Sequence, residues 1–479
     1  MRFKLILRFE SLLLVIISTF MFSSVLFDLY YKEHVAGYFL EIIALGYILG
    51  GSGIILSGKN TTDYLSKKEG FLLVSLSWVV ISLFGSLPYI LIAHFSLTDA
   101  FFETMSGFTT TGASIISDIE SLPKALLFWR SLTHWLGGMG IVVLTVAILP
   151  MLGVGGLNLI KAEAPGPSVE KLSPRITQTA KYLWIAYIVL SALETILLLF
   201  GGMNLFDALT HTFGTMATGG FSPKNTSVAW FNSAYIDWVI TVFMFIAGAN
   251  FAIHVKLLKG KFSALNDEEF KAYTVIILIA VFIVTLSNLN IYHNFINSLR
   301  YSAFQVVSII TTTGFVTADY DKWSSIAKMT LFLLMFVGGC AGSTGGSIKV
   351  IRIYTLLKQA INELKYNLHP KGVFTLLINN QPIRKNIVYS ISGFFFLYIA
   401  TFFVISLIIS FFNIDMITSL SATAATLGNI GPGFALVGPT HNYAWMPYSA
   451  KWILSFSMLI GRLEIYTVFV IFTPSFFKK

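Results

Sequence analysis

The chain has 479 residues, of which 55% are apolar types and only 11% are charged, with a formal net charge of +9 and a mean hydropathy of +0.76. Soluble domains carry about 25% charged residues, so this composition argues against a soluble enzyme, a disordered chain and a nucleic-acid-binding protein. Cys340 is the only cysteine, which excludes an intrachain disulfide and a metal site with several cysteine ligands. These properties predict a membrane protein.

Ten long apolar runs predict ten transmembrane helices, because a backbone in hydrocarbon must satisfy its own hydrogen bonds. The runs lie at residues 5–29, 38–56, 70–93, 126–152, 183–200, 234–255, 273–289, 329–350, 387–412 and 452–472. The first run follows three basic residues, as in a signal peptide, but no small-residue cleavage site comes after it. We therefore expect a retained first helix rather than a removed leader.

Four shorter apolar stretches lie between later runs, at residues 99–111, 206–218, 302–313 and 418–427. They are too brief to span a bilayer, and each is followed by a polar break that contains glycine, which is typical of re-entrant segments. The predicted fold class is an all-α polytopic membrane protein with about ten transmembrane helices and four re-entrant pore helices. The four pore helices would form a fourfold pseudo-symmetric array like that of a potassium channel.

The distribution of basic residues predicts the orientation of the chain. With the N-terminus inside and each short stretch entering from outside, 23 of the 32 Lys and Arg residues lie inside and eight lie outside, while Arg462 falls within the last span. Cytoplasmic loops are enriched in Lys and Arg, so the N-terminus is expected to be cytoplasmic. The excess positive charge is thus explained by topology rather than by nucleic-acid binding.

A fourfold repeat organises the chain from the third span onward. Its four breaks read FTTTGAS, TMATGGF, IITTTGF and ATLGNIG, with predicted pivotal glycines Gly112, Gly219, Gly314 and Gly428. The predicted units are two extra N-terminal spans at 1–69 and four repeats at 70–180, 181–270, 271–385 and 386–479. Four such loops around one axis could replace the hydration shell of a cation with backbone carbonyls, and glycine allows the unusual φ angles that this requires.

Six segments carry a resemblance to a known family: TMSGFTTTGAS (Thr104–Ser114), HWLGGMGIVVLTVAILPMLGVGG (His134–Gly156), TMATGGFSPKN (Thr215–Asn225), TTTGFVTADYDKW (Thr311–Trp323), GGCAGSTGGSIKVIR (Gly338–Arg352) and NIGPGF (Asn429–Phe434). Over nearly its whole length the chain resembles the Trk/Ktr/HKT superfamily of potassium transporters. Its two extra N-terminal spans fit the membrane subunits of bacterial Trk systems better than the shorter Ktr branch.

The resemblance implies a potassium pore in each subunit of a homodimer, in a bacterial inner membrane, with a cytosolic nucleotide-binding regulator of the TrkA type docked below. Carried over by position, the potassium-binding filter would comprise Thr110, Thr111, Gly112, Ala217, Thr218, Gly219, Thr312, Thr313, Gly314, Thr426, Leu427 and Gly428. The other three repeats have threonine at the position of Leu427. This departure in the fourth repeat puts strict selectivity against sodium in doubt.

The gate candidates lie in the third and fourth units. The stretch Gly342, Ser343, Thr344, Gly345, Gly346 and Ser347 breaks the eighth span, and the family places a mobile intramembrane loop there. Arg462 lies in the last span, where a charge is costly and usually faces a cavity or a partner. The alternatives are a tight glycine packing face for the loop, and a structural ion pair with Glu464 or another acid for Arg462.

Four other residues receive separate expectations. His134 and Trp135 are expected to anchor a span at the membrane interface, and Glu103 is expected to be a hydrogen-bonded support of the first pore helix. Glu194 lies within a span and is a functional candidate without a named partner.

A regulated, channel-like potassium uptake protein is the favoured function, and a proton- or sodium-coupled carrier is the alternative. Carriers often show inverted repeats with helices broken at mid-membrane, whereas the repeats here are parallel. HExxH and GxSxG motifs are absent from the sequence, so an enzyme is not expected.

Overall fold

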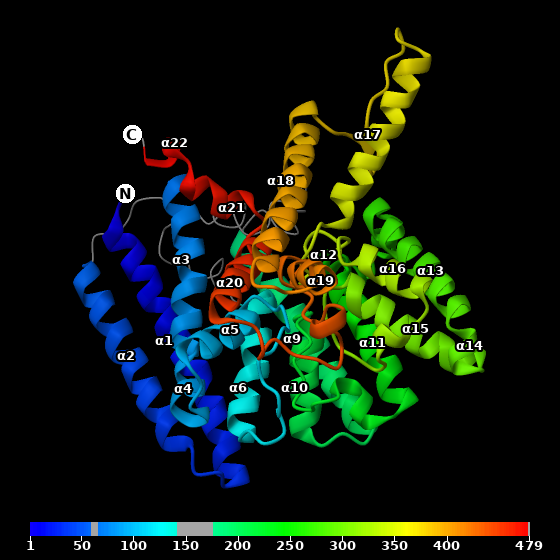
Figure 1. The fold of residues 1–479 in the computed structure, drawn as a ribbon. Helices are drawn as coiled ribbons and strands as arrows, with labels where there is room; N and C mark the ends of the chain where they lie inside the picture. Colours follow the sequence, from blue (N-terminus) through cyan, green and yellow to red (C-terminus); the bar gives the residue numbers. More distant parts are fainter. Residues whose placement is uncertain (59–65, 141–175, 478–479) are drawn as a thin grey trace.

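The computed structural model describes residues 1–58, 66–140 and 176–477, and the regular structure in this part of the chain is helical apart from one short hairpin and an isolated bridge. Within it, six helices are long and apolar enough to cross a membrane, or eight if each of two bent helix pairs counts as one span. The predicted all-α membrane fold is therefore confirmed (Figure 1).

Two N-terminal helices, α1 (Phe3–Tyr31) and α2 (Ala36–Ser57), pack side by side at one edge of the molecule (Figure 1). Their contact depends on small residues of α2 at helical spacing, Gly46, Gly50 and Gly53. A Cβ at Gly50 would lie 2.6 Å from Cγ2 of Val15 in α1. Without water to drive association, such close backbone approach is what stabilises helix pairs in lipid.

The rest of the chain repeats one pattern four times: a long helix, a short helix and a second long or broken helix. The first unit contains α3 (Lys67–Gly85), α4 (Leu87–Ala93), α5 (Leu97–Phe108), α6 (Lys124–Trp135) and the π-helical turn η1 (Leu136–Gly140). The second contains α9 (Ile176–Phe200), α10 (Leu205–Met216), the 3₁₀ turn η2 (Ser227–Phe231), α11 (Ala234–Gly248) and α12 (Phe251–Leu258).

The third unit contains η3 (Phe262–Asn266), α13 (Glu268–Ser287), α14 (Leu289–Tyr292), α15 (Phe295–Ile310), η4 (Tyr320–Lys322), α16 (Ser325–Leu334), α17 (Val350–Leu368) and the hairpin of β1 (Leu377–Ile378) with β2 (Gln381–Pro382). The fourth contains α18 (Lys385–Ser410), α19 (Met416–Leu427), η5 (Ala435–Val437), α20 (Tyr448–Arg462), α21 (Tyr466–Phe469), η6 (Val470–Phe472) and α22 (Pro474–Phe477).

The four short helices α5, α10, α15 and α19 are the predicted re-entrant segments. Each begins at a polar residue whose side chain accepts a hydrogen bond from a backbone N–H of the first turn; these N-caps are Ser96, Asn204, Asn294 and Asp415. The cap satisfies a backbone donor that has no partner within the helix. Local sequence therefore fixes where each short helix starts.

Three second spans are interrupted inside the molecule. The chain bends by 102° between α11 and α12, and by 109° between α20 and the segment Tyr466–Phe472. The predicted span 329–350 is not one helix, because α16 ends at Leu334 and a loop of residues 335–349 precedes α17. The predicted span 126–152 begins as α6 and η1, and its remainder lies outside the described residues.

Helix α17 projects from the body of the molecule, on the side where both termini lie (Figure 1). It carries exposed apolar residues along its length, including Leu357, Ile361, Leu364 and Leu368. Lys358 of this helix binds Glu268 at the start of α13 at 2.6 Å and the carbonyl of Leu377 at 2.8 Å, which holds α17 and the hairpin against α13.

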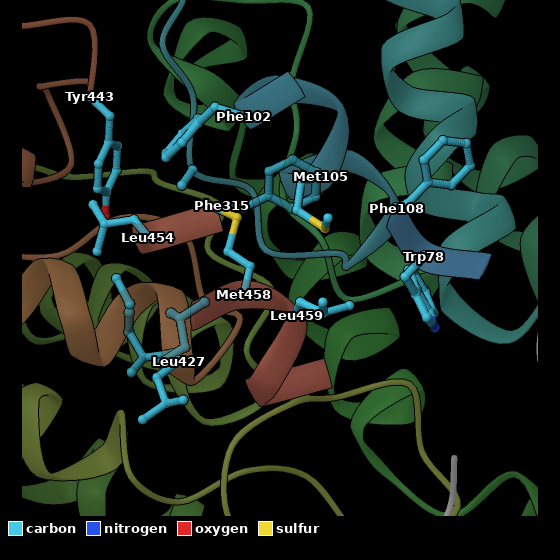
Figure 2. Close-up of a cluster of buried hydrophobic side chains, with 14 of the residues drawn as sticks. Trp78, Phe102, Met105, Phe108, Phe315, Leu427, Tyr443, Leu454, Met458 and Leu459 are labelled. Atoms are coloured by element: carbon cyan, nitrogen blue, oxygen red, sulfur yellow. The ribbon is translucent and has the colours of Figure 1, made fainter. Parts of the chain in front are cut away.

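The four short helices lie within the apolar core, which also includes buried residues of the long helices. Figure 2 shows part of it, where Phe102 and Met105 of α5 lie near Leu454, Met458 and Leu459 of α20. Leu427, the last residue of α19, belongs to the same apolar cluster and is fully buried. The short helices are thus held rigidly by packing on all sides.

The glycine contact between α1 and α2 generates a stability prediction. Gly50→Leu should lower the free energy of unfolding by about 1–3 kcal/mol, because the added side chain has no room against α1. Gly51→Leu is the matched control, since a Cβ at Gly51 meets nothing within 4 Å. The thermal unfolding midpoint of the purified protein in detergent measures both. Equal midpoints for the two variants would contradict this packing.

Candidate functional site

The four short helices end in the same backbone turn. In each, the C-cap residue is followed by a residue with left-handed φ, one further residue, and then a glycine with positive φ. The left-handed residues are Thr110, Thr218, Thr312 and Asn429, with φ of 52°, 54°, 60° and 53°. The glycines, named ring glycines below, are Gly112, Gly220, Gly314 and Gly431, with φ of 81°, 78°, 81° and 100°.

The four turns close into a ring through backbone contacts. A Cβ at Gly112 would collide with the carbonyl of Gly219, one at Gly220 with that of Thr313, and one at Gly314 with that of Ile430. A Cβ at Gly431 would lie 2.7 Å from the carbonyl oxygen of Thr111, so the fourth turn returns to the first. Both the positive φ and this close approach require glycine at each ring position.

The structural register differs from the predicted one in the second and fourth repeats. Gly219 lies one residue before its ring glycine, and Gly428 is the C-cap of α19 with a φ of −79°. Thr426 and Leu427 are helical residues of α19, so the predicted fourth triplet precedes the turn. The pivotal glycines of these repeats are therefore Gly220 and Gly431. The error arose because a TG or LG pair in sequence does not show where the helix ends.

Side chains of the turns also bind one another. Thr109 and Thr111 share a hydroxyl hydrogen bond of 2.8 Å, and Thr311 and Thr313 repeat it at the same distance. The Asn429 amide nitrogen donates to Oγ1 of Thr111 at 2.9 Å and to the carbonyl of Met458 at 3.0 Å. Asn429 therefore links the fourth turn to the first and to α20.

The loop of residues 335–349 contacts the ends of the short helices and is named the intramembrane loop. The N–H of Gly346 donates to Oγ1 of Thr312 at 2.7 Å, directly in the third turn. The hydroxyl of Thr344 lies 3.1 Å from the carbonyl of Met216 in α10 and 3.3 Å from that of Ala247 in α11. A Cβ at Gly346 would collide with the carbonyl of Gly428 in the fourth repeat.

Glu269, at the start of α13, binds the middle of the intramembrane loop and the first turn of α17. Its Oε1 accepts a hydrogen bond from the N–H of Ala341 at 2.6 Å and another from that of Ile351, in the first turn of α17, at 3.1 Å. The side chain is buried. Hydrogen bonds to a buried carboxylate are about twice as strong as neutral ones. The loop and the base of α17 therefore share one anchor.

Arg462 connects the intramembrane loop to the first repeat. Its guanidinium donates to the carbonyl of Thr344 at 2.8 Å and to the carbonyls of Gly137 and Gly138 at 2.7 and 2.9 Å. Arg462 is the last residue of α20, immediately before the 109° bend. Glu464, named above as its alternative ion-pair partner, is bound by Arg352 instead.

The separately considered polar residues have different outcomes. Glu103 accepts hydrogen bonds from the hydroxyl of Ser114 and the N–H of Ile115, which confirms its supporting role. The expectation that His134 is an interfacial anchor is wrong: it is fully buried, and its Nδ1 donates to the carbonyl of Gly107 at 2.7 Å. Glu194 is fully buried on α9, and its function stays a prediction.

Several site residues were missed by sequence reasoning. Gly220 could have been found by aligning the Gly-Phe pair at 220–221 with the pair at 314–315. Asn429 and Gly431 lie in a motif that lacks the Thr-Gly pair, so only the backbone identifies their positions. Glu269 carried no sequence signal, because its partners are backbone N–H groups about 70 to 80 residues away along the chain.

Comparisons with known proteins agree with this architecture. The family described as TrkH, cation transport protein, matches residues 42–479. The chain is 41% identical to the Trk system potassium uptake protein TrkH of Salmonella typhimurium and 40% identical to that of Escherichia coli, with full coverage of both chains. It is 32% identical to TrkG of Escherichia coli over 94% of each chain.

A solved structure supports the same relationship. The crystal structure of the potassium transporter TrkH from Vibrio parahaemolyticus matches with a TM-score of 0.89 and 37% identity, covering 100% of both chains. These similarities confirm the resemblance identified from the six sequence segments and the prediction of a transporter rather than an enzyme. A multi-pass membrane protein with this repeat, this ring and these relatives belongs to the TrkH family of cation transport proteins.

Proposed function

We propose that this protein is the membrane subunit of a potassium uptake system and that potassium passes through the ring of four turns. The observation that carries the proposal is the closed ring itself, in which each ring glycine lies against a carbonyl of the next turn. The names of its full-length relatives, potassium uptake proteins of Trk systems, indicate the ion.

In the proposed filter, backbone carbonyls of the four turns replace the water that a potassium ion loses on entry. The filter residues are then 110–112, 218–220, 312–314 and 429–431, which keeps the predicted first and third triplets and moves the other two. Each short helix ends at its turn, so the negative ends of four helix dipoles lie close to the ring. Both effects favour a cation over an anion.

The intramembrane loop and Arg462 form the proposed gate. The loop contacts the second, third and fourth repeats at the ends of their short helices, and Arg462 ties it to the first repeat through η1. A positive guanidinium in this place would also oppose a cation that leaves the ring. Movement of α17 would pull the loop through their shared anchor on Glu269.

The finer predictions from the family resemblance belong to the same proposal. They are a bacterial inner-membrane location with a cytoplasmic N-terminus, a homodimer with one pore per subunit, unit boundaries at residues 69, 180, 270 and 385, and a cytosolic nucleotide-binding regulator. The basic residues on the side of the N-terminus support the orientation. The projection of α17 on that same side supports an intracellular partner that acts on it.

The ring generates the test of the proposed function. Purified protein in liposomes should carry potassium. Gly220→Ala should reduce the potassium flux by at least about tenfold, because the added Cβ meets the carbonyl of Thr313. A buried overlap of this kind costs more than about 1 kcal/mol. Gly202→Ala is the matched control, since Gly202 also has positive φ (90°) but open space around it. Absence of flux for every monovalent cation in the wild-type protein, also with a regulator present, would refute the proposal.

The contacts of Arg462 generate a gating prediction. Arg462→Ala should raise potassium flux about tenfold in the absence of a regulator, because a charged hydrogen bond of about 1.5 kcal/mol or more then no longer holds the loop. Arg384→Ala, on the exposed residue before α18, is the control for loss of a positive charge. Unchanged flux in a variant that elutes as wild type in size-exclusion chromatography would contradict the gating role.

The chain carries its own probe of loop movement, because its only cysteine, Cys340, lies buried in the intramembrane loop. Glu269→Ala removes the acceptor of one hydrogen bond from the loop and one from the first turn of α17, and should make maleimide labelling of Cys340 about tenfold faster. Glu268→Ala is the matched control, because Glu268 binds Lys358 and Tyr354 of α17 instead of the loop. Equal labelling rates in the two variants would show that Glu269 is not an anchor.

A further inference from the structure

One position of the short helices carries chemically different side chains that perform a related task. It lies nine residues before each ring glycine and is occupied by Glu103, His211, Gln305 and Ala422. In the first three repeats, the side chain at this position binds the segment that follows the ring glycine of its own repeat. None of the contacts described above for the intramembrane loop or for Arg462 involves these side chains.

The first repeat has the strongest of these contacts. Glu103 accepts a hydrogen bond from the hydroxyl of Ser114 at 3.0 Å and from the N–H of Ile115 at 2.9 Å. It also forms an ion pair with Arg130 at 2.7 Å, and both side chains are at least 98% buried. A buried pair of this kind is rigid when its polar atoms are satisfied, and breaking it by removing one partner is strongly destabilising.

Arg130 extends this contact to the second repeat. Its guanidinium donates to the carbonyl of Ser222 at 2.9 Å and lies 3.5 Å from the ring centre of Phe221, the residue after ring glycine Gly220. Glu103 and Arg130 together therefore connect the segments that follow the first and second ring glycines. The ring contact of Gly112 with the carbonyl of Gly219 lies between the same two repeats.

The other three repeats use neutral groups. His211 donates from Nδ1 to the carbonyl of Asp207, which leaves Nε2 to accept from the hydroxyl of Ser222 at 3.0 Å. Gln305 reaches Oγ1 of Thr317 at 3.3 Å. In the fourth repeat Ala422 cannot bond, and the neighbouring Ser421 binds both backbone groups of Phe434.

We propose that Glu103 is a positioning residue for ion selection. Together with Arg130 it fixes the distance between the first and second turns. The inference rests on the proposed function, because it assigns the ring as the filter. Sodium needs shorter distances to its oxygen ligands than potassium does, and selection by carbonyls depends on how far they can approach the ion. The Glu103–Arg130 ion pair between two of the four turns limits the approach of their carbonyls to the ion more strongly than the neutral hydrogen bonds of the other repeats do.

The test compares potassium and sodium permeation through the full-length protein in liposomes. Glu103→Gln keeps the shape of the side chain but removes the charge that faces Arg130, and we expect the potassium-to-sodium flux ratio to fall about tenfold. Glu10→Gln is the matched control, since Glu10 is a buried acidic residue on α1, outside the four repeats, and its partner Ser77 in α3 does not belong to the ring. A purely structural role of Glu103 would reduce the flux of both ions and leave their ratio unchanged.

Two further variants keep the inference testable if Glu103→Gln does not fold. The double variant Glu103→Gln with Arg130→Gln removes both buried charges, and Ser114→Ala removes one bond to Glu103 without any change of charge. A lowered ratio in either variant supports the inference. A wild-type potassium-to-sodium flux ratio in both variants overturns the inference, even where potassium flux is normal. Absence of flux in the wild-type protein refutes the proposed function instead.

Discussion

The close approach of four backbone turns is the constraint on which the rest of this structure depends. Each ring glycine lies where any side chain would strike the carbonyl of the next turn, so the ring depends on the placement of all four turns. In a bilayer there is no water to replace a backbone contact that is lost. The surrounding elements therefore have to place four turns independently and with equal accuracy.

The short helices provide that accuracy through their ends. A capping side chain fixes the first turn of each helix, and the left-handed residue after the C-cap fixes the last. Gly346 then bonds to Thr312, which is the left-handed residue of the third turn. Because one residue belongs to both the ring and the loop contact, displacement of the loop changes the environment of the ring directly. The proposed gate and the proposed filter are therefore joined by one hydrogen bond rather than being distant sites.

Sequence reasoning predicted the elements whose signal is hydropathy. The four short helices and most long ones were recognisable because apolar runs of different length have only a few structures available in lipid. It predicted a break of the eighth span at residues 342–347, but not that the helix already ends at Leu334, since that depends on acceptors supplied by Glu269 and Gly248 from other elements. Nor did it predict the burial of His134, because α6 meets the second turn there instead of the membrane surface.

The fourth repeat explains why register was the hardest property to predict. Its turn has Asn429 where the other repeats have threonine, and asparagine tolerates the left-handed conformation better than most residues. The Asn429 amide also supplies a bond to Thr111, so the turn keeps its shape after losing the Thr-Gly pair. Leu427, which had cast doubt on selectivity, lies in the helix and packs in the core. The sequence of this repeat diverges while its backbone is retained, because the ring constrains φ angles and clearances rather than side-chain identity.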